Sequence, residues 1–491
     1  MRRLTGEESE WATAQFGDAE LGDSRRTARL VNMATRVAQT PAGRVSEVFR
    51  NRAEREGAYD LLEGNHVQPE MLLRSLASQA VRRAASEPFL FVSVDGSSVA
   101  LTDRNAAKGF GSVGALGRGG RGLKVISALG LSPAGVPVGL CAQTWWARTN
   151  AKSLSAKDKK KRNRKRKDED KETRYWLSTI DDSCAHALGA DAKLWFLLDR
   201  EADSRAVLLK LHSAGHRYTV RASWNRLIKA QGKDKQYLRK WLDAQPAGGT
   251  YALDVPAGPH RKARLANMVV RWGRVTLRIR DKRGRREQPL ELSVVWTREQ
   301  GTTAKNEKPL DWVLLTNVQV KTFDQARHII HGYTLRWRVE EFHKTWKTGA
   351  CQVERTQLRT QRAVTLWATI LAAVAVRVER LKRLARTTPE WSADVELSEH
   401  EIKALIVLRR DIKSRNEVIA DTTPTVGQAT LWIAELGGYT GKSSGGPPGS
   451  ITIRRGLDYL RPAAKLLQIL EDGRELASAG KDEAAARGRG S

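Results

Sequence analysis

The features that most constrain the fold are two short apolar segments, each followed directly by an aspartate. Residues 89–94 precede Asp95, residues 194–198 precede Asp199, and both segments are almost entirely apolar. Nearly continuous apolar runs of this length are typical of strands that are buried on both faces of a sheet. The sequence therefore predicts two interior strands that each end at an acidic residue.

Further strands are expected between these two, so the predicted fold class is α/β, with helices flanking a mixed sheet. Residues 124–131 and 136–141 are rich in apolar residues, and residues 96–98 are expected to form a turn. Ligands of such sheets gather at strand ends. An aspartate after a strand is also an ordinary turn or capping residue. Taken alone, each aspartate leaves both interpretations open.

A third acidic residue, Glu340, lies in residues 333–347, which contain no Gly or Pro and are predicted to be helical. At about 100° per residue, Tyr333, Arg336, Glu340 and Lys347 share one narrow stripe. The opposite face is apolar and consists of Leu335, Val339, Phe342 and Trp346. The apolar face can pack on a sheet while the polar stripe faces outward and meets a phosphate backbone. The simpler alternative is a surface helix in which Glu340 pairs with Lys344.

Composition favours a polyanionic partner. The chain has 491 residues and a net charge of +30, and neutralising DNA phosphates releases condensed counterions. A basic protein with no such partner is the alternative. Three widely spaced cysteines indicate neither a disulfide framework nor a zinc finger. The longest apolar run, residues 363–376, is too short to span a bilayer, and no signal peptide is expected because the first residues lack its apolar core.

The chain divides into three expected domains. Residues 1–70 form a helical domain in which Arg25, Arg26 and Arg29 lie on a capped helix, residues 71–385 form the core, and residues 386–491 form a helical domain with a disordered tail beyond about residue 480. Within the core, residues 224–316 alternate short β-rich runs with turns and are interpreted as a β insertion. Residues 157–167 are a basic run that is expected to be a solvated arm.

Asp95, Asp199 and Glu340 together can build a site for two divalent ions. Mg²⁺ prefers carboxylate oxygens and leaves positions open for phosphate oxygens. Two such ions can assist both the attacking and the leaving oxygen of a phosphodiester displacement. His328 and His331 have no third ligand in view and are expected to be ordinary helix residues.

The pattern Tyr333-x2-Arg336-x3-Glu340-x6-Lys347, together with residues 199–203, resembles the cut-and-paste insertion-sequence transposases of the DDE class. The similarity is to the IS-four family, and within it to the Tn-five type. It extends over most of the chain, from residues 21–23 and 56–59 to residues 436–438. The signature around Glu340 is specific, and the N-terminal matches are less so.

This resemblance implies an RNase H-like core with a β insertion, an N-terminal domain that binds the transposon end, and a C-terminal dimerisation domain. It implies that Asp95, Asp199 and Glu340 hold two Mg²⁺ ions, for which Mn²⁺ can substitute. Tyr333, Arg336, Lys347 and Arg221 match phosphate contacts, Trp312 matches a tryptophan that stacks on a flipped base, and Arg25, Arg26 and Arg29 match the end-binding helix. Two departures are the basic run 157–167 and Asp60, where a basic residue is expected.

The implied function is a bacterial transposase that acts on double-stranded DNA in the cytoplasm at the nucleoid, as a homodimer when it is synapsed on DNA. It would cut the transposon ends, form a hairpin and join the freed end to target DNA. An RNase H-like nuclease without strand transfer and a non-catalytic DNA-binding regulator are the alternatives.

Overall fold

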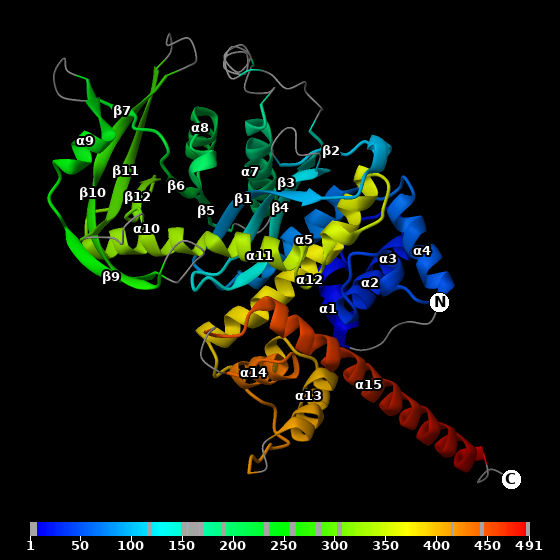
Figure 1. Cartoon of the computed structure of the whole chain (residues 1–491). Coiled ribbons are helices and arrows are strands. Elements are labelled where there is room, and N and C mark those ends of the chain that lie inside the picture. The colour runs from blue at the N-terminus through cyan, green and yellow to red at the C-terminus, as the bar shows by residue number, and fades with distance from the viewer. Residues whose placement is uncertain are drawn as a thin grey trace.

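One mixed sheet runs through the centre of the molecule, and helices cover both of its faces (Figure 1). The computed structural model describes residues 7–114, 120–148, 155, 166, 171–188, 192–229, 235–255, 262–280, 287–301, 307–413, 416–441 and 446–487. Apart from Arg166, the basic run 157–167 lies outside these residues, so its expected role as a solvated arm stays a prediction.

The sheet has 12 strands, in the order β2-β3-β1-β5-β6-β12-β11-β10-β7-β8, with β4 paired to β3 and β9 paired to β10. The strands are β1 (Leu90–Ala100), β2 (Gly111–Ser112), β3 (Arg121–Leu131), β4 (Pro137–Trp146), β5 (Leu194–Leu198), β6 (Arg217–Arg221), β7 (Leu227–Ile228), β8 (Gln236–Tyr237), β9 (Gly249–Val255), β10 (Arg264–Arg280), β11 (Glu287–Gln300) and β12 (Asp311–Thr316). The pairs β1–β5 and β5–β6 are parallel, and the other pairs are antiparallel.

The interior strands are buried on both faces, as their apolar composition predicts. Phe91 belongs to a core that lies between one face of the sheet and the helices after β12. Its neighbour Val92 belongs to a second core, which lies under the helices that surround β5. Successive side chains of a strand point to opposite faces, so a run such as residues 90–94 is apolar except for Ser93, whose hydroxyl is hydrogen-bonded.

The predicted turn at residues 96–98 is wrong. Strand β1 continues through Asp95 to Ala100, because β3 remains paired with it, with Gly96 opposite Ile126 and Ser98 opposite Lys124. The apolar run stops at Asp95 because the parallel neighbour β5 ends at the adjacent position, Leu198. Asp95 therefore lies within a strand, whereas Asp199 follows the end of one.

The strands between residues 227 and 316 continue the central sheet. The last of them, β12, pairs with β6 on one side and with β11 on the other, so core and outer strands share one hydrogen-bonded ladder. The β-rich segment thus occurs where the sequence predicts it, but it extends the core sheet. In Figure 1 these outer strands stand at the side of the molecule away from the N-terminal helices.

The helices of the first half of the chain are α1 (Glu7–Phe16), α2 (Ser24–Gln39), α3 (Val45–Val48), α4 (Arg52–Glu63), α5 (Pro69–Arg83), α7 (Thr173–Leu188), α8 (Arg205–Ser213) and α9 (Leu238–Asp243). After β12 come α10 (Phe323–Leu335), α11 (Trp337–Lys347), α12 (Gln361–Thr387), α13 (Glu399–Ile412), α14 (Val426–Leu436) and α15 (Ser450–Arg487). Side-chain caps fix several starts, including Asp23 before α2 and a capping box of Ser398 and Glu401 at α13.

The predicted helix 333–347 is divided in two. Helix α10 begins at Phe323, well before the predicted start, and Arg336 separates it from α11. The apolar face is buried as expected, but Tyr333 and Arg336 are only 3% and 5% exposed. The outward position predicted for these two residues is therefore wrong, because Arg336 contacts Ser93 and Asp95 of β1 and Tyr333 packs against Trp312 of β12.

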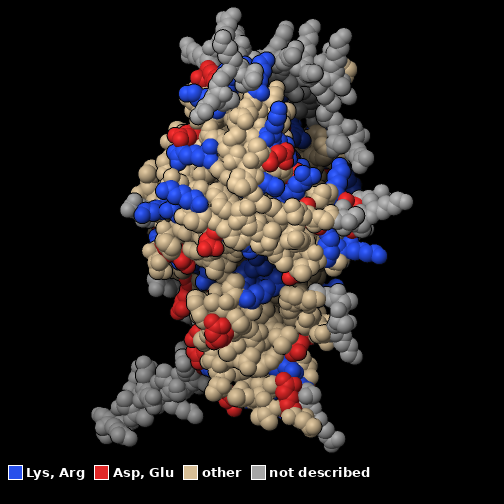
Figure 2. Space-filling model, turned by 90° about the vertical axis from the view of Figure 1, so that its left-hand side faces the viewer, with Lys and Arg blue, Asp and Glu red and all other residues tan. Residues whose placement is uncertain are grey.

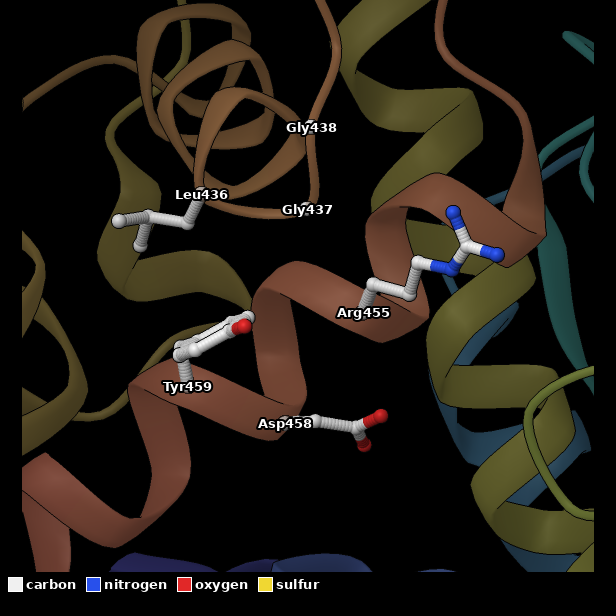
Figure 3. A pocket seen from close by; sticks show the side chains of 6 residues that line it. All are labelled: Leu436, Gly437, Gly438, Arg455, Asp458 and Tyr459. Atoms are coloured by element: carbon white, nitrogen blue, oxygen red, sulfur yellow. The ribbon is translucent and has the colours of Figure 1, made fainter.

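The C-terminal helices form a separate layer below the sheet (Figure 1). Gly437 permits close packing of α14 on α15, since an added Cβ would lie 2.0 Å from the Thr452 carbonyl oxygen. A pocket of about 520 Å³ lies beside this contact, and Figure 3 shows Tyr459 rising from α15 toward Gly437. Helix α15 continues to Arg487, whereas the sequence predicts a disordered tail beyond about residue 480.

Candidate active site

The parallel pairing of β1 with β5 brings two of the predicted acids to one edge of the sheet. Val94 is in register with Leu198, so the residues that come next, Asp95 and Asp199, occupy equivalent positions on the two neighbouring segments. Asp199 also caps the short helical turn after β5, accepting a hydrogen bond from the Glu201 N–H at 2.8 Å. Both carboxyl groups thus lie at the carboxyl end of β5, where ligands of such sheets bind.

Arg336 brings Glu340 to the same edge. The junction between α10 and α11 is held to β1 because the Ser93 hydroxyl donates to the Arg336 carbonyl oxygen at 2.8 Å. From there the Arg336 guanidinium lies 3.5 Å from Asp95 and forms an ion pair with Glu340 one turn along α11. Glu340 pairs with Arg336, not with Lys344 as in the simpler interpretation of the helix.

Electrostatics show that the three acids share one environment. Burial raises the pKa of Asp95 to about 7; the nearby Arg336 opposes this shift, and the charges of Asp199 and Glu340 add to it. On Arg336, burial disfavours the charge, but the carboxylates of Asp95 and Glu340 hold its pKa above the ordinary value. One buried cation therefore lies between the carboxyl groups of Asp95 and Glu340, and Asp199 adds a third acid that acts on Asp95.

The donor chemistry of this edge suits a hard divalent cation, because all three groups offer carboxylate oxygens. In the arrangement seen here Arg336 engages two of them. Across the described part of the chain, no group of three or more His, Cys, Asp or Glu side chains is positioned to hold a metal ion. The carboxylates therefore match the predicted ions in ligand type, but in this arrangement they do not surround a common ion position, and Arg336 pairs with Asp95 and Glu340.

Three of the predicted DNA contacts gather beside these acids. Trp312 packs edge to face against Tyr333, with ring centroids 5.6 Å apart. Arg221 donates to the Asp311 carbonyl oxygen at 3.0 Å, and burial raises the pKa of Tyr333 against the opposing charges of Arg336 and Arg221. Tyr333, Trp312 and Arg221 thus form one cluster next to Arg336.

Lys347 lies two turns beyond Glu340 on α11. Its ammonium group is 3.6 Å from Glu354, which also accepts the Ala100 N–H at 2.9 Å. Glu354 was not predicted, and no motif in the sequence marks it. Its contacts show that the end of β1 and the last turn of α11 are held together by one carboxylate.

The predicted N-terminal arginines have unequal exposure. The Arg25 side chain is 92% exposed, whereas Arg26 donates to the Leu21 carbonyl oxygen at 3.1 Å. Arg29 donates to the Gly57 carbonyl oxygen and lies 3.6 Å from Asp60. Asp60, the unexpected acid, is thus the partner of Arg29. Of the three, Arg25 is the most available to a phosphate.

Two histidines and one buried aspartate complete the surroundings. His328 packs against the rings of Phe89 and Trp195, as expected of an ordinary helix residue. Buried His343, whose Nε2 lies 3.1 Å from the Ser127 hydroxyl, has its pKa lowered to about 3 by burial. Asp203 anchors the loop after β6, and the signal that could have identified it is its place in residues 199–203.

Two family models match the chain. Residues 8–67 match the model described as Transposase DNA-binding, and residues 165–377 match the model described as Transposase DDE domain. The chain is a DDE transposase. The DDE domain implies an RNase H-like fold, in agreement with the mixed α/β architecture, and domains of this kind generally use divalent metal ions.

The two matches contain different groups of the predicted site residues. The DNA-binding match contains Arg25, Arg26 and Arg29, and establishes DNA as a partner. The DDE match contains Asp199 and Glu340 but begins after Asp95, which the sheet register supplies. Among the described helices, none is both long enough and apolar enough to cross a bilayer.

Figure 2 shows one face of the transposase, formed largely by the outer strands. Lysine and arginine side chains are scattered over it, and a group of them lies in a hollow at mid-height. With a net charge of +30, such a surface is suited to the backbone of DNA.

Proposed function

We propose that this transposase excises and inserts a DNA element by hydrolysis at the transposon ends, hairpin formation and strand transfer. Hydrolysis of one strand frees a 3′-hydroxyl, which attacks the opposite strand and closes a hairpin. Hydrolysis of the hairpin frees the hydroxyl again, and it then attacks target DNA. The observation that carries the proposal is that Asp95, Asp199 and Glu340 lie close enough at this edge of the sheet for the charges of Asp199 and Glu340 to raise the pKa of Asp95.

Asp95, Asp199 and Glu340 are the catalytic residues of this proposal and would hold two Mg²⁺ ions, or Mn²⁺ in their place. When bound, the ions supply Lewis-acid stabilisation of the attacking and leaving oxygens. Arg336 is the group that must share its carboxylate partners with them, since it now pairs with Asp95 and Glu340. Its guanidinium can turn to a phosphate instead.

The neighbouring residues would hold the DNA strand in place. Tyr333, Arg336 and Lys347 lie along α10 and α11 next to the acids, and Arg221 lies beside Tyr333. Trp312 would stack on a base flipped out when the hairpin forms, because base stacking on an aromatic ring is favourable by about 1–3 kcal/mol. Support for this role is the contact between the rings of Trp312 and Tyr333.

The domain organisation completes the proposal. Residues 1–70 would bind the transposon end through Arg25, Arg26 and Arg29, residues 71–385 would cut it, and residues 386–491 would pair two protomers on DNA. The protein would act at the bacterial nucleoid. Support comes from the DNA-binding match and from the separate layer formed by α13, α14 and α15.

The test uses DNA that carries the inverted repeats flanking the gene, with Mg²⁺ or Mn²⁺. Wild-type protein is expected to give cut, hairpin and joined products, whereas Glu340→Gln and Asp95→Asn give none. Glu341→Gln, whose carboxylate pairs with Arg383 of α12 instead of Arg336, is the matched control. Equal cleavage by wild type and the acid variants would overturn the proposal. Cleavage without any joined product would support the nuclease alternative.

A further inference from the structure

The loop after β6, residues 222–226, is held rigidly by one buried carboxylate. Asp203 accepts the backbone N–H of Ser223 at 2.6 Å and that of Trp224 at 3.1 Å, and it pairs with Arg226 at 2.7 Å. The Ser223 hydroxyl also donates to the Arg200 carbonyl oxygen at 3.1 Å. A fully buried carboxylate with these partners fixes the backbone of the loop.

This loop lies at the rim of the candidate active site. Strands β5 and β6 are parallel neighbours, so the loop after β6 leaves the sheet at the edge where Asp199 follows β5. Asp203 is four residues from Asp199. On the other side, the Ala222 N–H donates to the Val313 carbonyl oxygen at 2.8 Å, next to Trp312. The loop therefore joins the segment of the second acid to the strand that carries Trp312.

Trp224 is the exposed residue of this loop. Its relative exposure is 67%, the highest of any tryptophan among the described residues. Within the same part of the chain, no aromatic ring or cation is stacked on its indole, whereas Trp312 is packed against Tyr333. Leaving so large an apolar side chain in water forgoes its burial energy. The loop thus presents an aromatic surface on a fixed backbone.

We propose that Trp224 stacks on an unpaired nucleobase of the DNA strand held at the active site, and that Asp203 is its positioning residue. This inference rests on the proposed function, because it places the strand at the catalytic acids. A base is the ligand that fits a flat, exposed aromatic surface. The cation nearest the loop, Arg226, is held by Asp203, whereas the Arg239 side chain is 44% exposed and pairs with Asp311 at 2.8 Å, so Arg239 is the cation that a phosphate can reach.

Trp312 and Trp224 differ in exposure, and this difference gives them different roles in the proposal. Trp312 is partly buried beside Tyr333, so a base reaches it only when it is flipped into the site. Trp224 stands outside, where a base at a strand end or nick can meet it with no rearrangement of the protein. Stacking of this kind tolerates any base, since every base has a π face.

The first experiment compares binding of two 30-base-pair duplexes in EDTA, one fully paired and one with an unpaired 2-aminopurine at a nick. Trp224→Ala is expected to lose about five- to a hundredfold in affinity for the nicked duplex, along with quenching of the 2-aminopurine. Binding of the paired duplex should be nearly unchanged. Trp224→Phe should retain most of both signals. Trp391→Ala is the control, because Trp391 is also exposed but lies between α12 and α13.

Equal quenching and affinity for wild type and Trp224→Ala would overturn the proposal, as would an equal loss for Trp391→Ala. These binding measurements need no cleavage, so they are independent of whether Glu340→Gln abolishes activity. Failure of the proposed function would therefore show in the cleavage assay alone.

A double-mutant cycle tests the positioning role of Asp203. Asp203→Asn should weaken quenching in the wild-type background but cause no further loss in Trp224→Ala, because both changes act on one contact. Additive losses in the two backgrounds would reject the role of Asp203. If Asp203→Asn does not fold, Asn225→Ala, which removes the contact to Arg239, takes its place in the cycle.

Discussion

The two sides of helix α11 show opposite balances of charge, although they carry adjacent glutamates. Glu340 faces the sheet edge, where Arg336 is the shared cation of Asp95 and Glu340, and Asp199 adds a third carboxylate. Glu341 faces α12, where it forms ion pairs with Arg338 and Arg383. Carboxylates outnumber cations on the first side, and cations outnumber carboxylates around Glu341 on the second.

This difference is reflected in the pKa values. Burial and neighbouring acids raise the pKa of Asp95 to about 7. Burial has the same effect on Glu341, but Lys382, Arg383 and Arg338 outweigh it and lower its pKa. Perturbed acids with too little counter-charge are typical of functional sites, whereas acids matched by cations are typical of structural ion pairs. We infer that the first side of α11 is the chemical one and the second side is structural.

The largest expected effect separates the two glutamates by activity. Glu340→Gln should lower the rate of end cleavage by at least about a thousandfold, because loss of a metal ligand removes several kcal/mol of transition-state stabilisation. Glu341→Gln should stay within about tenfold of wild type, since a tenfold change is only about 1.4 kcal/mol. The measurement is single-turnover cleavage with Mg²⁺. A larger loss for Glu341→Gln would reverse the assignment of the two sides.

The next prediction concerns stability on the structural side. Glu379 is 1% exposed, pairs with Lys382 and accepts a hydrogen bond from Ser450 at 2.8 Å. Glu379→Leu should destabilise the protein by about 3–5 kcal/mol, because it leaves a buried ammonium group without its counter-charge. Urea unfolding measures the change. Glu291→Gln, which breaks an exposed pair with Arg274, is the control and should leave the midpoint unchanged.

A midpoint for Glu379→Leu equal to that of wild type would show that the ion pair of Glu379 and Lys382, behind α11, does not hold the C-terminal layer. The comparison between the two sides would then rest on the chemical side alone.

The third prediction uses the pH dependence of the chemical side. The pKa of Asp95 is raised to about 7 from the ordinary 3.8. The folded state therefore holds this proton more tightly than the unfolded state, and the resulting stability is complete below about pH 4 and is lost as pH rises through about 7. In EDTA, Asp95→Asn should be more stable than wild type by a few kcal/mol at pH 8, and by much less at pH 5.

Thermal unfolding from pH 5 to pH 8 measures this difference, with Asp421→Asn as the control because that side chain is 86% exposed. Mg²⁺ at pH 8 should raise the melting temperature of wild type and not that of Asp95→Asn. A pH-independent difference between the two proteins would contradict the shared-charge environment of the three acids.

The sequence predicted the chemical side better than its surroundings. The nearly continuous apolar strands indicated Asp95 and Asp199, because strands buried on both faces are mostly apolar. Glu340 followed from the polar stripe of a predicted helix and from a motif resemblance. The turn after Asp95 was predicted wrongly, because residues 96–100 are mixed in polarity and their strand depends on pairing with β3, a contact that local composition does not encode.

Tyr333 and Arg336 show a second limit of the sequence. Helical periodicity places them on a polar stripe, and a polar stripe is ordinarily exposed. Arg336 is buried because it contacts Ser93 and Asp95. Ser93 lies 243 positions earlier in the chain, so the contact is a tertiary one. No local pattern contains that information. The Glu341 network on the other side of α11 was missed for the same reason, since Arg383 comes from α12.

The smallest expected effect tests whether burial determines how strongly the ion pairs of the structural side couple. Arg29 and Asp60 in the N-terminal domain lie 3.6 Å apart, but their side chains are 40% and 74% exposed. A double-mutant cycle of Arg29→Ala and Asp60→Ala, measured by urea unfolding, should give a coupling energy of about 0.2–1 kcal/mol, because water screens exposed pairs. The pair behind α11, Glu379 with Lys382, should give a larger coupling in the same assay. A coupling for Arg29 and Asp60 as large as that of the buried pair would mean that desolvation does not distinguish these sites. Geometry alone would then have to explain why the ion pairs behind α11 are structural.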